Sequence, residues 1–415
     1  MIDLPVDPLS DRELRDLREA GIALFAGRVI LNAQPPVDDA TLAAVAERCA
    51  GPLPDPLVAL WRTAFGGRLD YDLRADLDGQ DVPLSFTELF YPDSDDYQDL
   101  WGWIGHEIDL ADEHEPQWSG RLGHLPIGGF EYLDRVYVNT VAGQDHGAVV
   151  CWRHGLPAGW ELRTGDRSGW LADDLHTLFG QLMLERDPWN VPEGTGAEMR
   201  DAVDELTNSA DAHLRTAAAK VRRLVRQTVL DWRSALDEGT LPRQRRLRRL
   251  AMDRAVTDDD VALLARLVSL GCDPAEEISN GLTPLDLALM LQSSDATRWL
   301  LQHDVPVDNA LQVGAHAVDL ELARNLIDRG ASVNECAVIR AVDNENVEVV
   351  RLLSNAVRPD ALGRLSQRLR TMAGQATPAG RDSSAQPGTP AGEREYRRAA
   401  VLAELADRFD ADRQP

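Results

Sequence analysis

A segment rich in histidine and glutamate holds the side chains most able to do chemistry in this chain. His106-Glu107 and His114-Glu115 lie eight residues apart, and His124 follows. Imidazole and carboxylate groups at close helical spacing bind zinc and activate water. A spacing of eight puts both histidines on one helical face but two turns apart, too far to share one metal ion directly. The pattern favours ordinary surface histidines, and we predict neither a metal nor a cofactor.

Motifs for other catalytic chemistry do not occur in the sequence. There is no glycine-rich phosphate loop, no G-x-S-x-G elbow, no C-x-x-C pair and no cysteine–histidine pairing with motif support. The serines at 85, 94 and 119 are typical of loops. Scattered cysteines are typical of reduced, buried and inert thiols. We therefore predict a protein that is not an enzyme.

Acidic and aromatic residues are concentrated between residues 70 and 115. This stretch has fifteen acidic residues against one basic residue, Arg74, and aromatic residues are interleaved with them, among them Phe86, Phe90, Tyr91, Tyr97, Trp101 and Trp103. One interpretation is a solvated acidic loop. The other is a contact surface for a basic partner, where aromatic side chains supply buried area and carboxylates supply steering and arginine pairing. Calcium is a third possibility, but residues 72–81 lack the ligand spacing of an EF-hand loop. We assign the candidate partner-binding residues as Asp93, Asp95, Asp96, Tyr97, Asp99, Trp101 and Trp103.

The composition limits the classes of partner. The net charge of −26 over 415 residues argues against general binding to nucleic acid or to anionic membranes. The first residues lack the basic and apolar regions of a signal peptide, and no apolar run approaches the length of a membrane span. We expect a cytoplasmic protein with two or three domains.

The acidic stretch lies within an N-terminal half that combines helices and strands. Residues 38–50 and 54–65 read as helices, and residues 69–73, 135–141 and 148–152 as strands. A helix over residues 170–184 follows them. The order helix, helix, strands, helix predicts an α+β sandwich with helices on one side of a sheet.

Three motifs in this half give it a family resemblance. They are "LPDPLVALWRTAFGG" (53–67), "LPIGGF" (125–130) and "GAVVCW" (147–152), followed by an apolar helix. Their order resembles the SUKH superfamily over roughly residues 35–185. The resemblance implies a binding protein without catalytic residues, since bacterial members are commonly immunity proteins that neutralise toxins and eukaryotic members are regulatory scaffolds.

The C-terminal half shows a repeated helix ending. Similar apolar endings reach Gly271, Asp304, Gly330 and Ala356, at intervals of 33, 26 and 26 residues. Each unit reads as two short helices whose apolar stripe is buried only by stacking on neighbours.

The segment "NGLTPLDLALMLQ" (280–292) shows how one of these helices begins. Asn280-Gly281 predicts a tight turn, Thr283 an N-cap, Pro284 the first helical position and Asp286 the return bond of a capping box. The segment resembles the ankyrin repeat, with Asp286 where that motif usually carries histidine. The later units lose about seven residues, enough to remove the projecting hairpin of that repeat.

A run of five arginines, "RQRRLRRL", precedes the repeats at residues 243–250. One interpretation is a nucleic-acid patch. The interpretation we favour is the solvated face of a helix, with Leu247 and Leu250 inward and the arginines paired with nearby acids.

The chain ends in two contrasting segments. Residues 373–392 are of low complexity and predict disorder. The following "EREYRRAAVLAELADRF" predicts an amphipathic helix that either caps the repeats or binds a partner.

These interpretations give a domain map and a functional hypothesis. The map is a SUKH-like domain (1–190), a helical connector (191–242), about four ankyrin-like repeats (243–368), a disordered linker (369–393) and a C-terminal helix (394–415). We expect an immunity protein that neutralises a basic toxin domain through the SUKH-like domain, with the repeats as additional scaffold. The alternative is a regulatory scaffold for endogenous cytosolic proteins.

Overall fold

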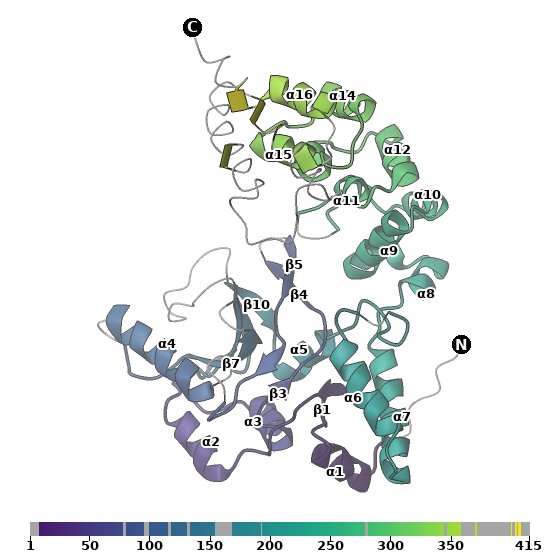
Figure 1. Cartoon of the computed structure of the whole chain (residues 1–415). Helices are drawn as coiled ribbons and strands as arrows, with labels where there is room; N and C mark the ends of the chain where they lie inside the picture. The colour runs from purple at the N-terminus through teal and green to yellow at the C-terminus, as the bar shows by residue number, and fades with distance from the viewer. Residues whose placement is uncertain are drawn as a thin grey trace. The chain divides into compact units, whose positions relative to one another are not determined.

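The structure is a computed structural model, in which the chain divides into two compact units between Leu230 and Asp231 (Figure 1). It describes residues 8–77, 80–94, 99–114, 118–130, 133–153, 168–191, 193–278, 281–343, 347–357, 370–371, 400, 403–404 and 406–407. The N-terminal unit contains a sheet with flanking helices, and the described part of the C-terminal unit consists of helices and their connections. The mixed α/β composition with a helical C-terminal region is as predicted.

The main sheet of the N-terminal unit has six antiparallel strands in the order β10-β9-β8-β7-β6-β3. Successive side chains in a strand point to opposite faces, so Val136 and Val138 share one face while Arg135 and Tyr137 share the other. The predicted pairing of residues 135–141 with 148–152 is confirmed by β8 and β9. The strands are β3 (Gly67–Arg68), β6 (Glu88–Leu89), β7 (His124–Phe130), β8 (Asp134–Asn139), β9 (Val149–Arg153) and β10 (Ser168–Ala172).

Two separate hairpins accompany this sheet: β1 (Ala23–Phe25) with β2 (Arg28–Ile30), and β4 (Leu73–Leu77) with β5 (Gln80–Leu84). The strand predicted over 69–73 is wrong, because β4 begins only at Leu73. The backbone before it bonds elsewhere, with the Asp72 amide donating to the Met183 carbonyl at 2.8 Å.

Helices predicted near the N-terminus are confirmed. Helix α2 (Asp39–Ala46) is capped by Asp38, and α3 (Asp55–Thr63) buries Leu57, Leu60 and Trp61.

The helix predicted over 170–184 is too long. Trp170 lies in the edge strand β10, and α5 (Leu175–Gln181) begins only after Asp174. The Asp174 carboxylate accepts from the Thr177 amide at 2.7 Å and sets this start. The remaining helices of the unit are α1 (Asp11–Glu19), α4 (Leu100–His114), α6 (Ala197–Thr207) and α7 (Ala212–Gln227).

Helices α6 and α7 belong to the N-terminal unit, which extends beyond the predicted boundary at residue 190. Their apolar faces are buried in the same core as the sheet, through Met199, Val203, Val221 and Val225 among others. The indole of Trp189 donates to Asp204 at 2.9 Å. The predicted connector 191–242 is therefore divided, with most of it in this core and residues from Asp231 onward in the C-terminal unit.

The described helices of the C-terminal unit after α8 (Trp232–Asp237) form four consecutive pairs. First helices stack in the order α9, α11, α13, α15, and each packs on the second helix of its own pair. The pairs are α9 (Arg245–Thr257) with α10 (Val261–Ser269), α11 (Pro284–Leu291) with α12 (Ser294–Gln302), α13 (Ala310–Gly314) with α14 (Leu320–Asp328), and α15 (Glu335–Asp343) with α16 (Val347–Ala356).

The predicted capping box at the start of α11 is confirmed. The Asp286 amide donates to the Thr283 hydroxyl oxygen at 3.2 Å, and the Thr283 amide donates to the Asp286 carboxylate at 3.0 Å. Asp286 is buried. These bonds satisfy amides that the first helical turn leaves unpaired.

The arginine run forms ion pairs within the unit, as predicted, but it is not the solvated face that the same interpretation expected, because Arg245, Arg246 and Arg248 are half-buried and Arg249 is buried. Arg248 donates to Glu276 at 2.6 Å, and Arg245 lies 3.7 Å from the same carboxylate. Arg249 is buried and donates to the Ile278 carbonyl at 3.1 Å. The run thereby fastens the loop before α11 onto α9.

Only a few residues of the tail are described. Residues 400, 403–404 and 406–407 are helical, Ala406 is buried in the core of the C-terminal unit, and Glu404 lies 3.9 Å from Arg351 of α16. This segment contacts the last helix pair. Apart from residues 370–371, the predicted linker 369–393 lies outside the described residues.

Candidate interaction surfaces

Several carboxylates of the acidic stretch form part of the folded framework. Asp70 accepts from the amides of Gly196 and Met199 at 2.8 and 3.0 Å, so it caps α6 in place of a side chain at Gly196 itself. Asp72 accepts from the Glu185 amide at 2.9 Å. The Asp81 carboxylate lies 2.9 Å from Arg74 across the β4–β5 hairpin. These acids hold distant segments together and are not a partner surface.

The aromatic residues assigned to partner binding are placed differently from one another. Trp103 of α4 is only 4% exposed, and the Arg135 guanidinium stacks 3.5 Å from the centre of its ring. Trp101 is half-buried beneath Arg48, whose guanidinium lies 4.7 Å from its ring centre. Trp103 therefore belongs to the interior, whereas part of the Trp101 side chain remains exposed to solvent. Tyr97 lies outside the described residues.

The aspartates assigned to partner binding also differ in their surroundings. Asp99 precedes α4, and its carboxylate accepts from the Gly102 amide at 2.9 Å, so it caps the helix. Asp93 is exposed in a turn with φ of 57°. Asp95 and Asp96 lie outside the described residues.

A buried polar cluster lies between α4 and the sheet, which Figure 1 shows beside each other. Arg135 is fully buried, and its Nη1 donates to the Asp134 carbonyl at 2.7 Å. Glu107 of α4 is 1% exposed and accepts from the Tyr137 hydroxyl at 2.7 Å. Burial lowers the pKa of Arg135 to about 10, against the opposing influence of Tyr137 and neighbouring carboxylates. Arg135 therefore remains a cation at neutral pH.

Glu88, Gly129 and Arg135 are cross-strand neighbours in one row of the sheet. A side chain at Gly129 would meet the Asp134 carbonyl oxygen at 2.1 Å, so only glycine fits there. Nε and Nη2 of Arg135 and Oε2 of Glu88 are buried without a hydrogen-bond partner in the described structure. What joins α4 to the sheet is the stack of Arg135 on Trp103 and the hydrogen bond from Tyr137 to Glu107.

The outer face of α4 carries three exposed carboxylates of the acidic stretch. Asp109, Asp112 and Glu113 are exposed, and their spacing of three and four residues puts them on one side of the helix. Trp103 and Glu107 lie on the inner side of the same helix. One helix thus presents acids outward and is held from behind by a stack and a hydrogen bond.

The histidine–glutamate segment does not assemble as a metal site in the described residues. Among them, no group of three histidine, cysteine, aspartate or glutamate side chains is close enough to hold an ion. Glu107 instead bonds Tyr137, and His106 packs edge-on against Trp103 at 5.6 Å between ring centres.

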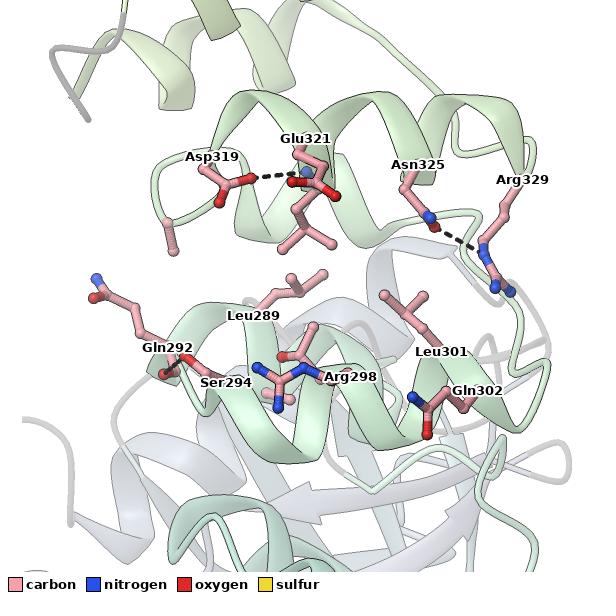
Figure 2. Close-up of a pocket in the computed structure, with 14 residues that line it drawn as sticks. Leu289, Gln292, Ser294, Arg298, Leu301, Gln302, Asp319, Glu321, Asn325 and Arg329 are labelled. Atoms are coloured by element: carbon pink, nitrogen blue, oxygen red, sulfur yellow. Dashed lines mark hydrogen bonds between the residues drawn. The ribbon is translucent and has the colours of Figure 1, made fainter.

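A second candidate surface is a groove of about 600 Å³ in the C-terminal unit. Its walls are α12 and α14, and its floor includes Leu289 and Leu301 (Figure 2). Leu322 also lines it. Outer helices pack directly at the steps α10–α12 and α14–α16, whereas the groove separates α12 from α14. On the inner side α13 lies very close to α11, since a side chain at Gly314 would meet Leu289 at 2.5 Å.

Neither Arg135 nor the groove was identified from the sequence. Arg135 stands in an alternating strand where a charged residue normally points to solvent, so the pattern predicts an exposed side chain. The groove exists because the outer helices of two neighbouring, similar helix pairs lie farther apart than those of the other pairs. The shortened interval after Asp304 does not signal it, because the next step has the same interval of 26 residues and its outer helices pack directly.

Comparisons add no family assignment to this geometry. In the described part of the chain no helix is long and apolar enough to cross a bilayer. A scan against protein-family models matched none to this chain, and a search of curated proteins found no similar sequence.

Proposed function

We propose that this chain is a non-enzymatic protein-binding protein of the immunity type, which neutralises a basic toxin domain through the acidic outer face of α4. The SUKH-like motifs of its N-terminal unit and the ankyrin-like motif of its helical unit support this class. The observation that carries the proposal is the side-by-side exposure of Asp109, Asp112 and Glu113 on α4.

A rigid acidic helix face suits a basic partner. Three carboxylates within five residues attract cations over a distance comparable to the Debye length, about 8 Å at physiological ionic strength. Because α4 is capped by Asp99 and fastened by Trp103 and Glu107, the carboxylates need little ordering when a partner binds. The half-buried Trp101 lies two turns before Asp109 on the same helix, beneath Arg48, and supplies apolar area at the other end of the face.

The proposed contact set differs from the one assigned from sequence. Asp109, Asp112 and Glu113 replace Asp99, whose reversal would uncap α4. Trp103 is a support rather than a contact. Asp93 stays in the set because it is exposed.

The test begins with a pull-down by the full chain from its native organism and continues with association kinetics on the captured protein. Changing Asp109, Asp112 and Glu113 together to arginine should lower the on-rate at low salt by about tenfold or more, and raising salt should slow the wild type. Glu19, Asp173 and Glu193 are exposed acids elsewhere in the same unit, so their triple reversal adds equal charge and is the control.

If the two triple variants lowered the on-rate equally, the effect would come from the net charge of the chain and not from the outer face of α4. A captured partner whose association ignores salt would contradict it. Capture of an endogenous regulatory protein instead of a secreted toxin would favour the scaffold alternative.

A further inference from the structure

The groove between α12 and α14 has a defined charge order along its length. Asp319 and Glu321 lie at the end where both helices begin, and Arg329 lies at the end where α14 stops (Figure 2). Asn325 orients Arg329 by accepting from its Nε at 2.8 Å. The groove therefore has an acidic end and a basic end, and Arg298 of α12 lines it between them (Figure 2). At the basic end Arg329 also lies 3.4 Å from Asp304.

Amide side chains occur on both walls of the groove. Gln302 extends from α12 and Asn325 from α14, and both are exposed. A primary amide donates and accepts at once, which matches the alternating N–H and C=O groups of an extended peptide backbone. The half-buried Leu322 offers an apolar contact between the walls, above the buried Leu289 and Leu301.

The length of the groove matches a short extended segment. Ten residues separate Asp319 from Arg329, which corresponds to about 15 Å along a helix at a rise of about 1.5 Å per residue. An extended chain rises about 3.3 Å per residue, so about four or five residues span the groove.

We propose that this groove binds an extended peptide segment of a partner protein, with a basic side chain at the end near Asp319 and Glu321, an apolar side chain over the leucine floor, and a carboxylate at the end near Arg329. Charge complementarity selects this occupant and also its direction. The site lies in the C-terminal unit and does not depend on the acidic face of α4, so either proposal can fail while the other holds.

The test uses a random octapeptide library displayed on phage and selected on the full chain. Enriched sequences should share the order basic, apolar, acidic, and synthetic peptides of those sequences should bind the wild type. Changing Glu321 to lysine should weaken their binding about tenfold. The control, Glu238→Lys, makes the same charge change at an exposed residue of the same unit outside the groove and should leave affinity within about twofold.

A second variant separates binding from folding. Asn325→Trp fills the groove from an exposed position without changing charge, so it should abolish peptide binding while circular dichroism and thermal melting stay near wild type. Peptides that bind this variant as tightly as the wild type, enriched peptides without the charge order, or a selection that yields no peptide sensitive to either variant would overturn the proposal.

Discussion

Two charged runs of opposite sign, residues 70–115 and 243–250, are used in different ways by the two units. In the acidic run, Asp70 bonds the Met199 amide 129 residues away. In the basic run, Arg248 bonds Glu276 only 28 residues away. The N-terminal unit is closed by long-range contacts, whereas the C-terminal unit is held by contacts between successive helix pairs.

This difference explains why the two surfaces arise differently. In the N-terminal unit, carboxylates that are not needed for long-range contacts remain on the outer face of α4. In the C-terminal unit, stacked pairs leave a groove wherever one step is spaced differently from the next. We expect mutations to affect the first unit as a whole and the second unit mainly near the mutated pair.

The largest expected effect comes from shortening the N-terminal unit. A fragment ending at residue 195 lacks α6 and α7, which exposes the core around Met199 and Val221, so it should aggregate or melt without cooperativity. A fragment ending at Leu230 should melt cooperatively by circular dichroism. A cooperative melt of the shorter fragment would show that the N-terminal unit folds without α6 and α7, which would then be a connector.

The next largest effect concerns the buried cation under α4. Arg135→Ala removes the stack on Trp103 and leaves a large cavity beneath α4, which should lower the free energy of unfolding by about 3–5 kcal/mol in urea titrations. Arg248→Ala in the helical unit should lower it by about 1–2 kcal/mol, because that pair is partly solvated. Equal losses would mean that burial does not distinguish the two arginines.

A smaller, pH-dependent effect concerns the contact between α1 and α7. The hydrogen bond from Lys220 lowers the pKa of Glu13 to about 2, from 4.5, with further help from the Ser10 amide. Because the folded pKa is depressed, this stabilisation is present above about pH 4.5 and is lost as the pH falls toward 2.

Glu13→Gln mimics the protonated carboxyl group and should cost about 1.5–3 kcal/mol at pH 7. The difference from wild type in denaturant titrations should shrink steadily between pH 4.5 and pH 2. Glu19→Gln, at an exposed position of the same helix, should show no such trend. A difference that stayed constant with pH would assign the loss to packing instead of charge.

The smallest effect is expected at the start of α11. Thr283→Ala removes the cap and should lower the free energy of unfolding by about 0.5–2 kcal/mol. Thr216→Ala on the exposed side of α7 should change it by less than about 0.5 kcal/mol. A large loss of partner binding by Thr283→Ala at unchanged stability would show that Thr283 is a contact residue.

Local features of this protein follow from the sequence alone. The caps at Asp38 and Thr283, the pairing of β8 with β9 and the succession of helix pairs all depend on neighbours a few residues apart or on regular spacing. Such interactions have the same geometry in any surroundings, so their residues identify them.

The tertiary structure alone decided what depends on distant residues. Asp70 and Asp109 are both acids of one charged stretch, yet Asp70 caps a helix far along the chain and Asp109 faces solvent. Trp103 and Trp101 are two residues apart in one helix, and only the fold places Arg135 against Trp103. Residue type and spacing do not reveal which partner arrives from another strand or helix. The same sequence pattern therefore predicted a single acidic surface, whereas in the described residues the fold leaves acids on the outer face of α4 and at Asp93 and uses Asp70, Asp72, Asp81 and Asp99 for contacts of its own.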